Sequence, residues 1–303
     1  MADFIIANKS EICLDQTELG INSYIDEEVR VMSTELIMLG GERGSGKSIV
    51  VSNIAVNQYK NNNVGIIFSI EMRGREVFDR NLSILSGVSY NRLRNGTLTN
   101  EDFYKLAVSR KDMFLDSDSI FEKYLETRDF RNFELELVKK KLREDAQLII
   151  VDNQRLTIAD IDSILTKQKA IFGSNLKTAS IDYVNQIHVE SDLYDWKTQI
   201  TLSKRLKDLA RKHDISMITP YQIDKTGEAR FAKGLLDAAD MAFILSADEE
   251  SIAFKSTKIR SGAHFETKSM MNWECLTLDS TRVSETTKSL NNDVAKAEAV
   301  SDI

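Results

Sequence analysis

The sequence predicts an α/β fold with a mostly parallel central sheet flanked by helices. Three observations support this prediction. Short apolar runs at 36–39, 64–70 and 215–219 have the composition of buried strands. The stretches between them hold long runs without glycine or proline, which is typical of helices. The run 64–70 is apolar almost throughout instead of alternating, as in strands that are covered on both faces of a parallel sheet.

A glycine-rich segment joins the first predicted strand to a helix expected at 47–60. Its residues are Gly41, Glu42, Arg43, Gly44, Ser45, Gly46, Lys47 and Ser48. They fit the pattern G-x-x-x-x-G-K-[ST], whose backbone N–H groups surround phosphate oxygens at a helix N-terminus. The pattern predicts nucleotide binding, with Lys47 on the β- and γ-phosphates and the Ser48 hydroxyl on Mg²⁺.

Length and composition limit the remaining possibilities. The 303 residues suffice for one large α/β domain, and the cysteines are Cys13 and Cys275, far apart in the chain. This usage argues against a disulfide framework and a zinc site and suits a reducing compartment. The apolar runs are too short for a membrane span, so we expect a cytoplasmic protein, in the host cytoplasm if a phage encodes it. The net charge of −7 excludes a generally basic nucleic-acid-binding surface but allows a local basic patch.

Glu71 follows the predicted strand 64–70 directly. Ligands of parallel α/β sheets bind at the carboxyl ends of the strands, where the glycine-rich segment also lies. A carboxylate there can align a water molecule for attack on a γ-phosphate. The alternative is a surface glutamate at the start of the helix expected at 74–87.

A longer pattern identifies a family resemblance. Ser69-Ile70-Glu71-Met72 is followed by Arg80, by Leu85-Ser86-Gly87-Val88, and by the segment from Arg92 to Asp102. In order and spacing these resemble the motor domain of DnaB-type, phage-like replicative helicases. The resemblance implies a RecA-like P-loop NTPase fold, ATP and Mg²⁺ as cofactors, and 5′-to-3′ translocation on single-stranded DNA. It further implies a hexameric ring and a primase or helicase loader as partner.

Two strand-like runs compete for the aspartate that coordinates Mg²⁺. The run ending at Asp152 is the more apolar, whereas Asp182 ends a weaker run at 179–182. The order of segments decides for Asp182, because Tyr183-Val184-Asn185-Gln186-Ile187 resembles the family segment that follows its magnesium aspartate.

The resemblance assigns four further groups of residues. Gln222, at the tip of the strand expected at 215–219, would contact the γ-phosphate; its alternative is a polar loop residue. Lys225, Arg230 and Lys233 form a basic loop that would bind single-stranded DNA. Lys258 and Arg260 would act on the nucleotide of a neighbouring subunit, and their alternative is a basic hairpin turn.

The expected organisation is a short N-terminal linker segment at 1–25, a motor domain at 26–283 and a disordered tail at 284–303. A charged helix at 120–143 is predicted within an insertion at about 111–145. Two other functions stay open: a RecA-fold recombinase or ATP-switch protein that forms filaments on DNA, and a helicase-like loader or regulatory ATPase.

Overall fold

The computed structural model describes residues 16–189, 196–223, 232–260, 262–283 and 287–289. A single sheet runs through this part of the chain, in the order β10-β8-β7-β6-β1-β5-β4-β2-β3, with β9 paired to β8. Strands β1 to β6 pair with one another in parallel, and β7 to β10 extend the sheet from β6 in antiparallel fashion. The prediction of a mostly parallel sheet is therefore confirmed. The strands are β1 (Leu36–Gly41), β2 (Val64–Ser69), β3 (Gln147–Asp152), β4 (Leu176–Asp182), β5 (Ser216–Gln222), β6 (Met241–Ala247), β7 (Ser251–Ile259), β8 (His264–Asn272), β9 (Thr277–Val283) and β10 (Thr287–Ser289).

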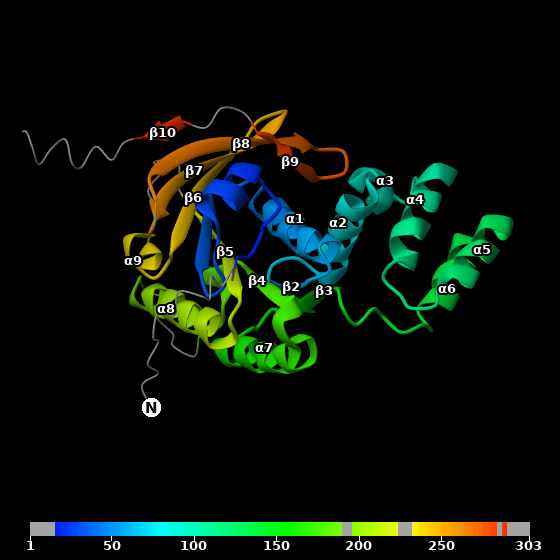
Figure 1. The fold of residues 1–303 in the computed structure, drawn as a ribbon, viewed down its shortest axis with the longest axis horizontal. Helices are drawn as coiled ribbons and strands as arrows, with labels where there is room; N and C mark the ends of the chain where they lie inside the picture. The colour runs from blue at the N-terminus through cyan, green and yellow to red at the C-terminus, as the bar shows by residue number, and fades with distance from the viewer. Residues whose placement is uncertain (1–15, 190–195, 224–231, 261, 284–286, 290–303) are drawn as a thin grey trace, which may run out of the picture.

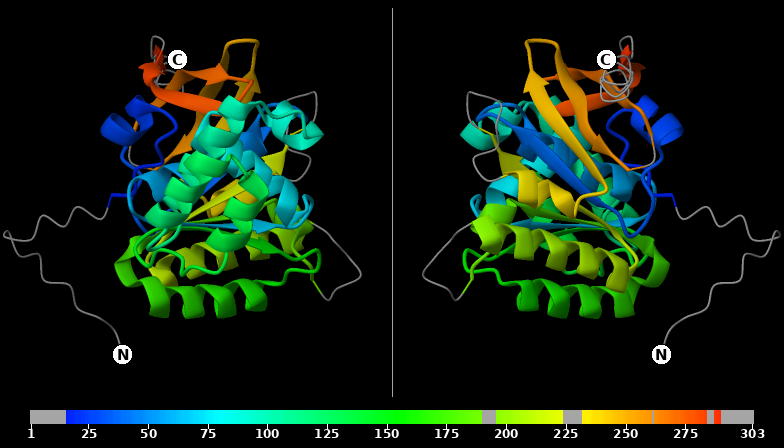
Figure 2. Two further views of the ribbon diagram at one scale, coloured as in Figure 1. Left: turned by 90° about the vertical axis from the view of Figure 1, so that its right-hand side faces the viewer. Right: turned by 90° about the vertical axis from the view of Figure 1, so that its left-hand side faces the viewer.

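Helices cover both faces of the parallel strands (Figures 1 and 2). Alternate residues of β1 show the two layers, because side chains of a strand point to opposite faces in turn. Leu36 and Met38 lie in a core that includes residues of α7 and α8, whereas Ile37 and Leu39 lie in a core with residues of α1. The helical segments are η1 (Ile25–Val29), α1 (Lys47–Lys60), α2 (Gly74–Ser86), α3 (Tyr90–Asn95), α4 (Asn100–Lys111), α5 (Asp118–Thr127), α6 (Phe130–Leu137), α7 (Ile158–Phe172), η2 (Gly173–Asn175), η3 (Val184–Gln186), α8 (Trp196–His213) and α9 (Ala232–Asp237).

The prediction of one helix at 120–143 is wrong, because the structure has two shorter helices there, α5 and α6. Arg128 takes a left-handed conformation (φ 56°) and ends α5. The Asp129 side chain then accepts a hydrogen bond from the Asn132 N–H and caps the start of α6. Folding back on itself, the segment buries Tyr124 and Phe133 with Ala107 of α4 in a small core of its own.

The described part of the predicted linker, residues 16–25, packs onto the sheet. Leu19, Ile21 and Ile25 are fully buried in the same core as α1. The buried Asn22 amide donates to the Ser269 hydroxyl of β8 at 2.8 Å. This segment is thus built into the domain. Within the described ranges, no helix has both the length and the apolar character that crossing a membrane requires.

Candidate functional site

The glycine-rich segment lies between the carboxyl end of β1 and the first turn of α1, as predicted. Gly44 and Gly46 have φ values of 82° and 84°, a conformation that other residues rarely adopt. A Cβ atom on Gly46 would also lie 2.7 Å from Cδ1 of Ile252 in β7. The loop therefore requires glycine both for its backbone conformation and for its contact with the antiparallel part of the sheet.

Lys47 is buried in this loop with its ammonium group turned back on the backbone. Its Nζ atom donates to the carbonyl oxygens of Gly41 and Glu42, each at 2.6 Å. Burial lowers the pKa of Lys47, and the nearby Asp182 carboxylate opposes this shift. A phosphate group would offer the ammonium a stronger partner than two neutral carbonyls.

Asp182 ends β4 and is only 7% exposed. The nearby Ser48 hydroxyl favours the charged form of its carboxylate and so lowers its pKa, while Oδ1 has no hydrogen-bond partner among the described residues. Burial raises the pKa of Asp182 and the Glu71 carboxylate adds to the rise, while Ser48, Arg80 and Lys47 oppose it only in part. A buried carboxylate oxygen without a partner, beside a hydroxyl, fits the oxygen ligands that Mg²⁺ prefers.

Asp152, the rival aspartate, has a different environment. It ends β3 at the edge of the sheet and is exposed, and its Oδ2 accepts a hydrogen bond from the Gly74 N–H at 2.7 Å. This contact lies at the start of α2, where an acceptor satisfies one of the free N–H groups of the helix. The stronger apolar run in the sequence thus leads to a carboxylate that caps a helix.

Glu71 lies at the same end of the parallel strands as Asp182, which is their carboxyl end. Ser69, the last residue of β2, is in register with Asp182 of β4. Glu71 follows two residues later and is exposed, and its carboxylate accepts a hydrogen bond from the Tyr183 hydroxyl. The sequence gives no signal for this tyrosine contact, because Tyr183 belongs to a different strand end.

Gln222 ends β5 and is in register with Gly41, the first residue of the glycine-rich segment. The N–H of the following residue, Ile223, donates to the Gly41 carbonyl at 3.3 Å. The exposed Gln222 side chain therefore starts from the strand end that adjoins the loop.

Arg80 is a site residue that the sequence did not single out for a role, although it is part of the family resemblance. It lies on α2, and its pKa is lowered by burial and raised by Tyr90 and Asp182. Its Nε atom is buried and has no hydrogen-bond partner among the described residues. In the sequence, the feature that points to a role at the site is the position of Arg80 on the helix that starts just after Glu71.

Lys258 and Arg260 lie at the opposite end of the strands, near the amino ends of β1 and β6. Ile259 is in register with Met241 at the start of β6, and Met241 is in register with Ile37 near the start of β1. The six residues of β1 separate this end of the strands from the glycine-rich segment. A strand of that length spans roughly 20 Å. One chain does not bring these two basic residues to its own loop.

Both basic residues have partners within the chain. The Lys258 ammonium donates to the carbonyl oxygens of Leu236 and Asp237 at the end of α9. Nη1 of Arg260 lies 2.8 Å from Oδ1 of the buried Asp240.

The predicted DNA-binding residues cannot be placed. Lys225 and Arg230 lie outside the described residues, and so does the side chain of Lys233, whose backbone belongs to α9. The segment that holds them follows β5, and therefore comes directly after Gln222 and Ile223.

Comparisons with known proteins agree with this arrangement. Residues 24–235 match the family described as the DnaB-like helicase C terminal domain. The replicative DNA helicase DnaB of Mycoplasma pneumoniae is 26% identical over 206 residues, which are 65% of this chain and 37% of that protein. The chain thus corresponds to a little over a third of the length of this curated relative.

Solved structures show the same fold. The ATPase domain of G40P superposes with a TM-score of 0.69 at 15% identity, covering 86% of this chain and 89% of that one. A DnaB-like replicative helicase, studied with its interactions with primase, gives a TM-score of 0.68 at 15% identity, covering 86% of this chain and 60% of that one. With its phosphate-binding loop and the match over residues 24–235, the chain belongs to the DnaB-like helicase C-terminal domain family.

Proposed function

We propose that this chain is the motor of an ATP-dependent replicative DNA helicase. The proposal rests on five side chains that converge at the carboxyl ends of the parallel strands, around the glycine-rich segment: Lys47, Ser48, Glu71, Asp182 and Gln222. Parallel α/β sheets bind their ligands at these strand ends. The residue types are those that phosphoryl transfer to water requires: a cation, a hydroxyl, and carboxylates with different surroundings.

Each side chain has a role that follows from its environment. Lys47 would exchange the carbonyls of Gly41 and Glu42 for β- and γ-phosphate oxygens. Ser48 and Asp182 would hold Mg²⁺, which supplies positive charge that neutralises the phosphates. Arg80, buried beside Asp182, adds a second positive charge.

Glu71 is the proposed general base. Its carboxylate is exposed at the strand end, so that a water molecule can reach it, and the Tyr183 hydroxyl fixes its orientation. Gln222 lies across the loop, at the end of β5, where its amide would contact the γ-phosphate. Loss of that phosphate would remove this contact of Gln222 and so affect the segment that follows β5.

The same segment is the proposed contact with single-stranded DNA through Lys225, Arg230 and Lys233. Its position immediately after Gln222 supports coupling between phosphate loss and DNA movement. The proposed direction is 5′ to 3′. A primase or a helicase loader is the proposed protein partner, since a structurally similar helicase is described with its interactions with primase.

The proposed assembly is a hexameric ring, supported by the position of Lys258 and Arg260. Both lie across the sheet from their own loop, so they would serve the nucleotide of a neighbouring subunit. The Arg260 side chain is 59% accessible, which would allow it to reach a neighbouring subunit.

Two variants test the chemistry. Lys47→Ala should abolish ATP binding, because it removes the cation that contacts the β- and γ-phosphates. Glu71→Gln should bind ATP as the parent does and lose about 10²- to 10⁴-fold in hydrolysis, the usual contribution of a general base. Equilibrium binding of a fluorescent ATP analogue and phosphate release measure both. Parental turnover by Glu71→Gln would show that Glu71 is not the base.

A further inference from the structure

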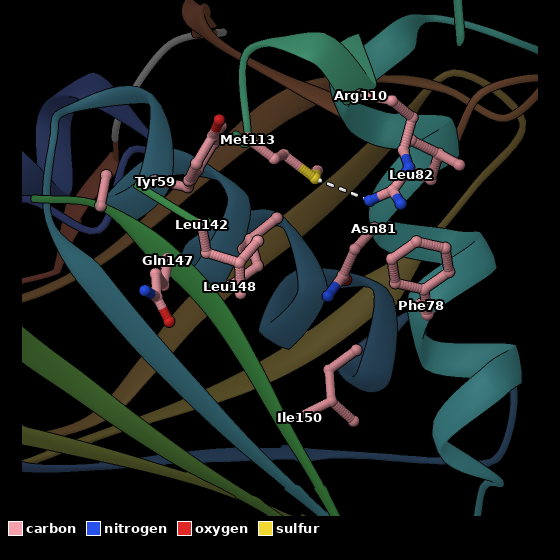
Figure 3. Close-up of a pocket in the computed structure, with 11 residues that line it drawn as sticks. Tyr59, Phe78, Asn81, Leu82, Arg110, Met113, Leu142, Gln147, Leu148 and Ile150 are labelled. Atoms are coloured by element: carbon pink, nitrogen blue, oxygen red, sulfur yellow. Dashed lines mark hydrogen bonds between the residues drawn. The ribbon is translucent and has the colours of Figure 1, made fainter. Parts of the chain in front are cut away.

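A second cavity lies apart from the phosphate-binding loop, between α1, α2 and the edge strand β3 (Figure 3). Its volume is about 170 Å³. Aromatic and branched apolar side chains form most of the wall, among them Tyr59, Phe78, Leu148 and Ile150. Leu142 closes one side and is 45% exposed, so the cavity is next to solvent there.

One polar side chain in this wall is unsatisfied. Asn81 of α2 is only 2% exposed, and neither its amide nitrogen nor its amide oxygen has a hydrogen-bond partner among the described residues. The side chain extends into the cavity, toward the space between Phe78 and the residues of β3 (Figure 3). A buried amide that lacks both partners is rare and destabilising, and it often indicates an absent ligand or water.

The other polar groups around the cavity already have partners. The Tyr59 hydroxyl donates to the Asp112 carbonyl at 2.9 Å, and the Gln147 amide donates to the Arg143 carbonyl at 2.7 Å. Arg110 forms an ion pair with Glu134 at 3.0 Å. An anionic ligand would have to compete with Glu134 for Arg110, whereas a neutral ligand with one donor beside one acceptor would satisfy Asn81 without disturbing that pair.

We propose that this cavity binds an adenine ring, as the free base or as a nucleoside. An asparagine amide pairs with adenine through two parallel hydrogen bonds, one given and one received. The apolar wall formed with Leu148 and Ile150 would pack against a flat ring, and guanidinium groups already lie over the Phe78 and Tyr59 rings. A dry cavity of about 150 Å³ accommodates benzene, so this one has room for a ring system whose substituent leaves past Leu142.

The site is separate from the proposed ATP site and is tested without it. Radiolabelled adenine and adenosine are each measured by equilibrium dialysis against the full chain carrying Lys47→Ala, in which the phosphate-binding loop is disabled. We expect saturable binding of adenine at one site per chain. Adenosine binding in addition would assign the nucleoside, and adenine binding alone would assign the base.

Matched changes in protein and ligand identify the contact. Asn81→Leu keeps the size of the side chain and removes both hydrogen bonds, so affinity should fall at least about tenfold. Ala146→Leu fills the cavity without changing Asn81 and should also prevent binding. Asn91→Leu, the same change at an exposed position of α3, should leave binding intact. Purine, which lacks the exocyclic amine, should bind the parent at least about tenfold more weakly than adenine.

Thermal melts confirm that each variant is folded before dialysis. Absence of saturable adenine binding to the Lys47→Ala chain would overturn the proposal. So would unchanged affinity in folded Asn81→Leu, because Asn81 would then be satisfied by water alone.

Discussion

Nη1 of Arg260 lies 2.8 Å from Oδ1 of Asp240. This pair lies at the end of the strands that is opposite the phosphate-binding loop. Asp240 is 3% exposed and has other partners: the Lys207 ammonium at 2.6 Å and the Leu36 N–H at 2.8 Å. Both of these partners bind Oδ2, so without Arg260 that oxygen of the buried carboxylate would stay paired and only Oδ1 would lose a contact. This allows the stability and the activity of an Arg260 variant to be separated.

Arg260→Ala should nearly abolish ATP hydrolysis while ATP still binds. An arginine that stabilises the transferred phosphate contributes about 10³- to 10⁵-fold in rate. The free energy of unfolding should fall by about 1–3 kcal/mol, because Oδ1 of the buried Asp240 loses its partner. Phosphate release and denaturant unfolding give the two numbers. Full activity of Arg260→Ala alone would rule out the shared site.

Mixing two inactive variants tests the sharing itself. Lys47→Ala chains keep Arg260 but cannot bind ATP, and Arg260→Ala chains bind ATP but lack the arginine. Where an Arg260→Ala chain binds ATP beside a Lys47→Ala neighbour, the site is complete, so mixing should restore part of the activity if subunits exchange. Subunit exchange, followed by fluorescence energy transfer between labelled chains, is the control. No recovery despite exchange would argue that each chain completes its own site.

Asp182→Asn and Asp152→Asn should differ in their effects on ATP hydrolysis. Asp182→Asn removes the charged ligand proposed for Mg²⁺ and should lower Mg²⁺-dependent hydrolysis severely. Asp152→Asn should change both hydrolysis and the free energy of unfolding little, because the amide oxygen of Asn can still accept the hydrogen bond from the Gly74 N–H. Hydrolysis measured across a range of Mg²⁺ concentrations distinguishes the two. Greater loss of activity in Asp152→Asn would mean that the magnesium site is misassigned.

Binding of single-stranded DNA should require ATP or an analogue and weaken as salt increases, despite the acidic net charge. Release of counterions predicts a slope of about −0.7 in log affinity against log salt for each phosphate neutralised. Changing Arg230 and Lys233 together to Ala should make the slope less steep and leave ATP binding unchanged. Fluorescence anisotropy of a labelled oligonucleotide at several salt concentrations measures this. An unchanged slope would indicate that DNA contacts another surface.

The fold and the loop could be predicted because their signals are local. Apolar runs mark buried strands, and the glycines at 44 and 46 mark backbone conformations that other residues avoid. The choice of Asp182 over Asp152 could not be made from apolar composition, because β3 is an edge strand with only half-buried residues and still reads as the stronger run. Segment order chose the residue that the structure buries beside Ser48.

Other features depend on contacts between distant segments, which a single sequence does not display. Asn22 is paired with Ser269, so residues 16–25 belong to the domain although they carry no periodic pattern. The electrostatic interaction between Arg80 and Asp182 likewise arises only when α2 packs against the sheet beside β3. The break between α5 and α6, in contrast, had a local signal that was missed: Asp129 is a favourable helix N-cap.

Strand separation on tailed DNA is the direct test of the proposed helicase activity. A duplex with a fluorophore and a quencher at its end is offered with two single-stranded tails, with a 5′ tail only, or with a 3′ tail only. We expect ATP-dependent release of the labelled strand from the forked duplex, entry through the 5′ tail, and no release with Glu71→Gln. Release that proceeds without hydrolysis, entry through the 3′ tail, or DNA-stimulated hydrolysis in open filaments without strand separation would contradict it.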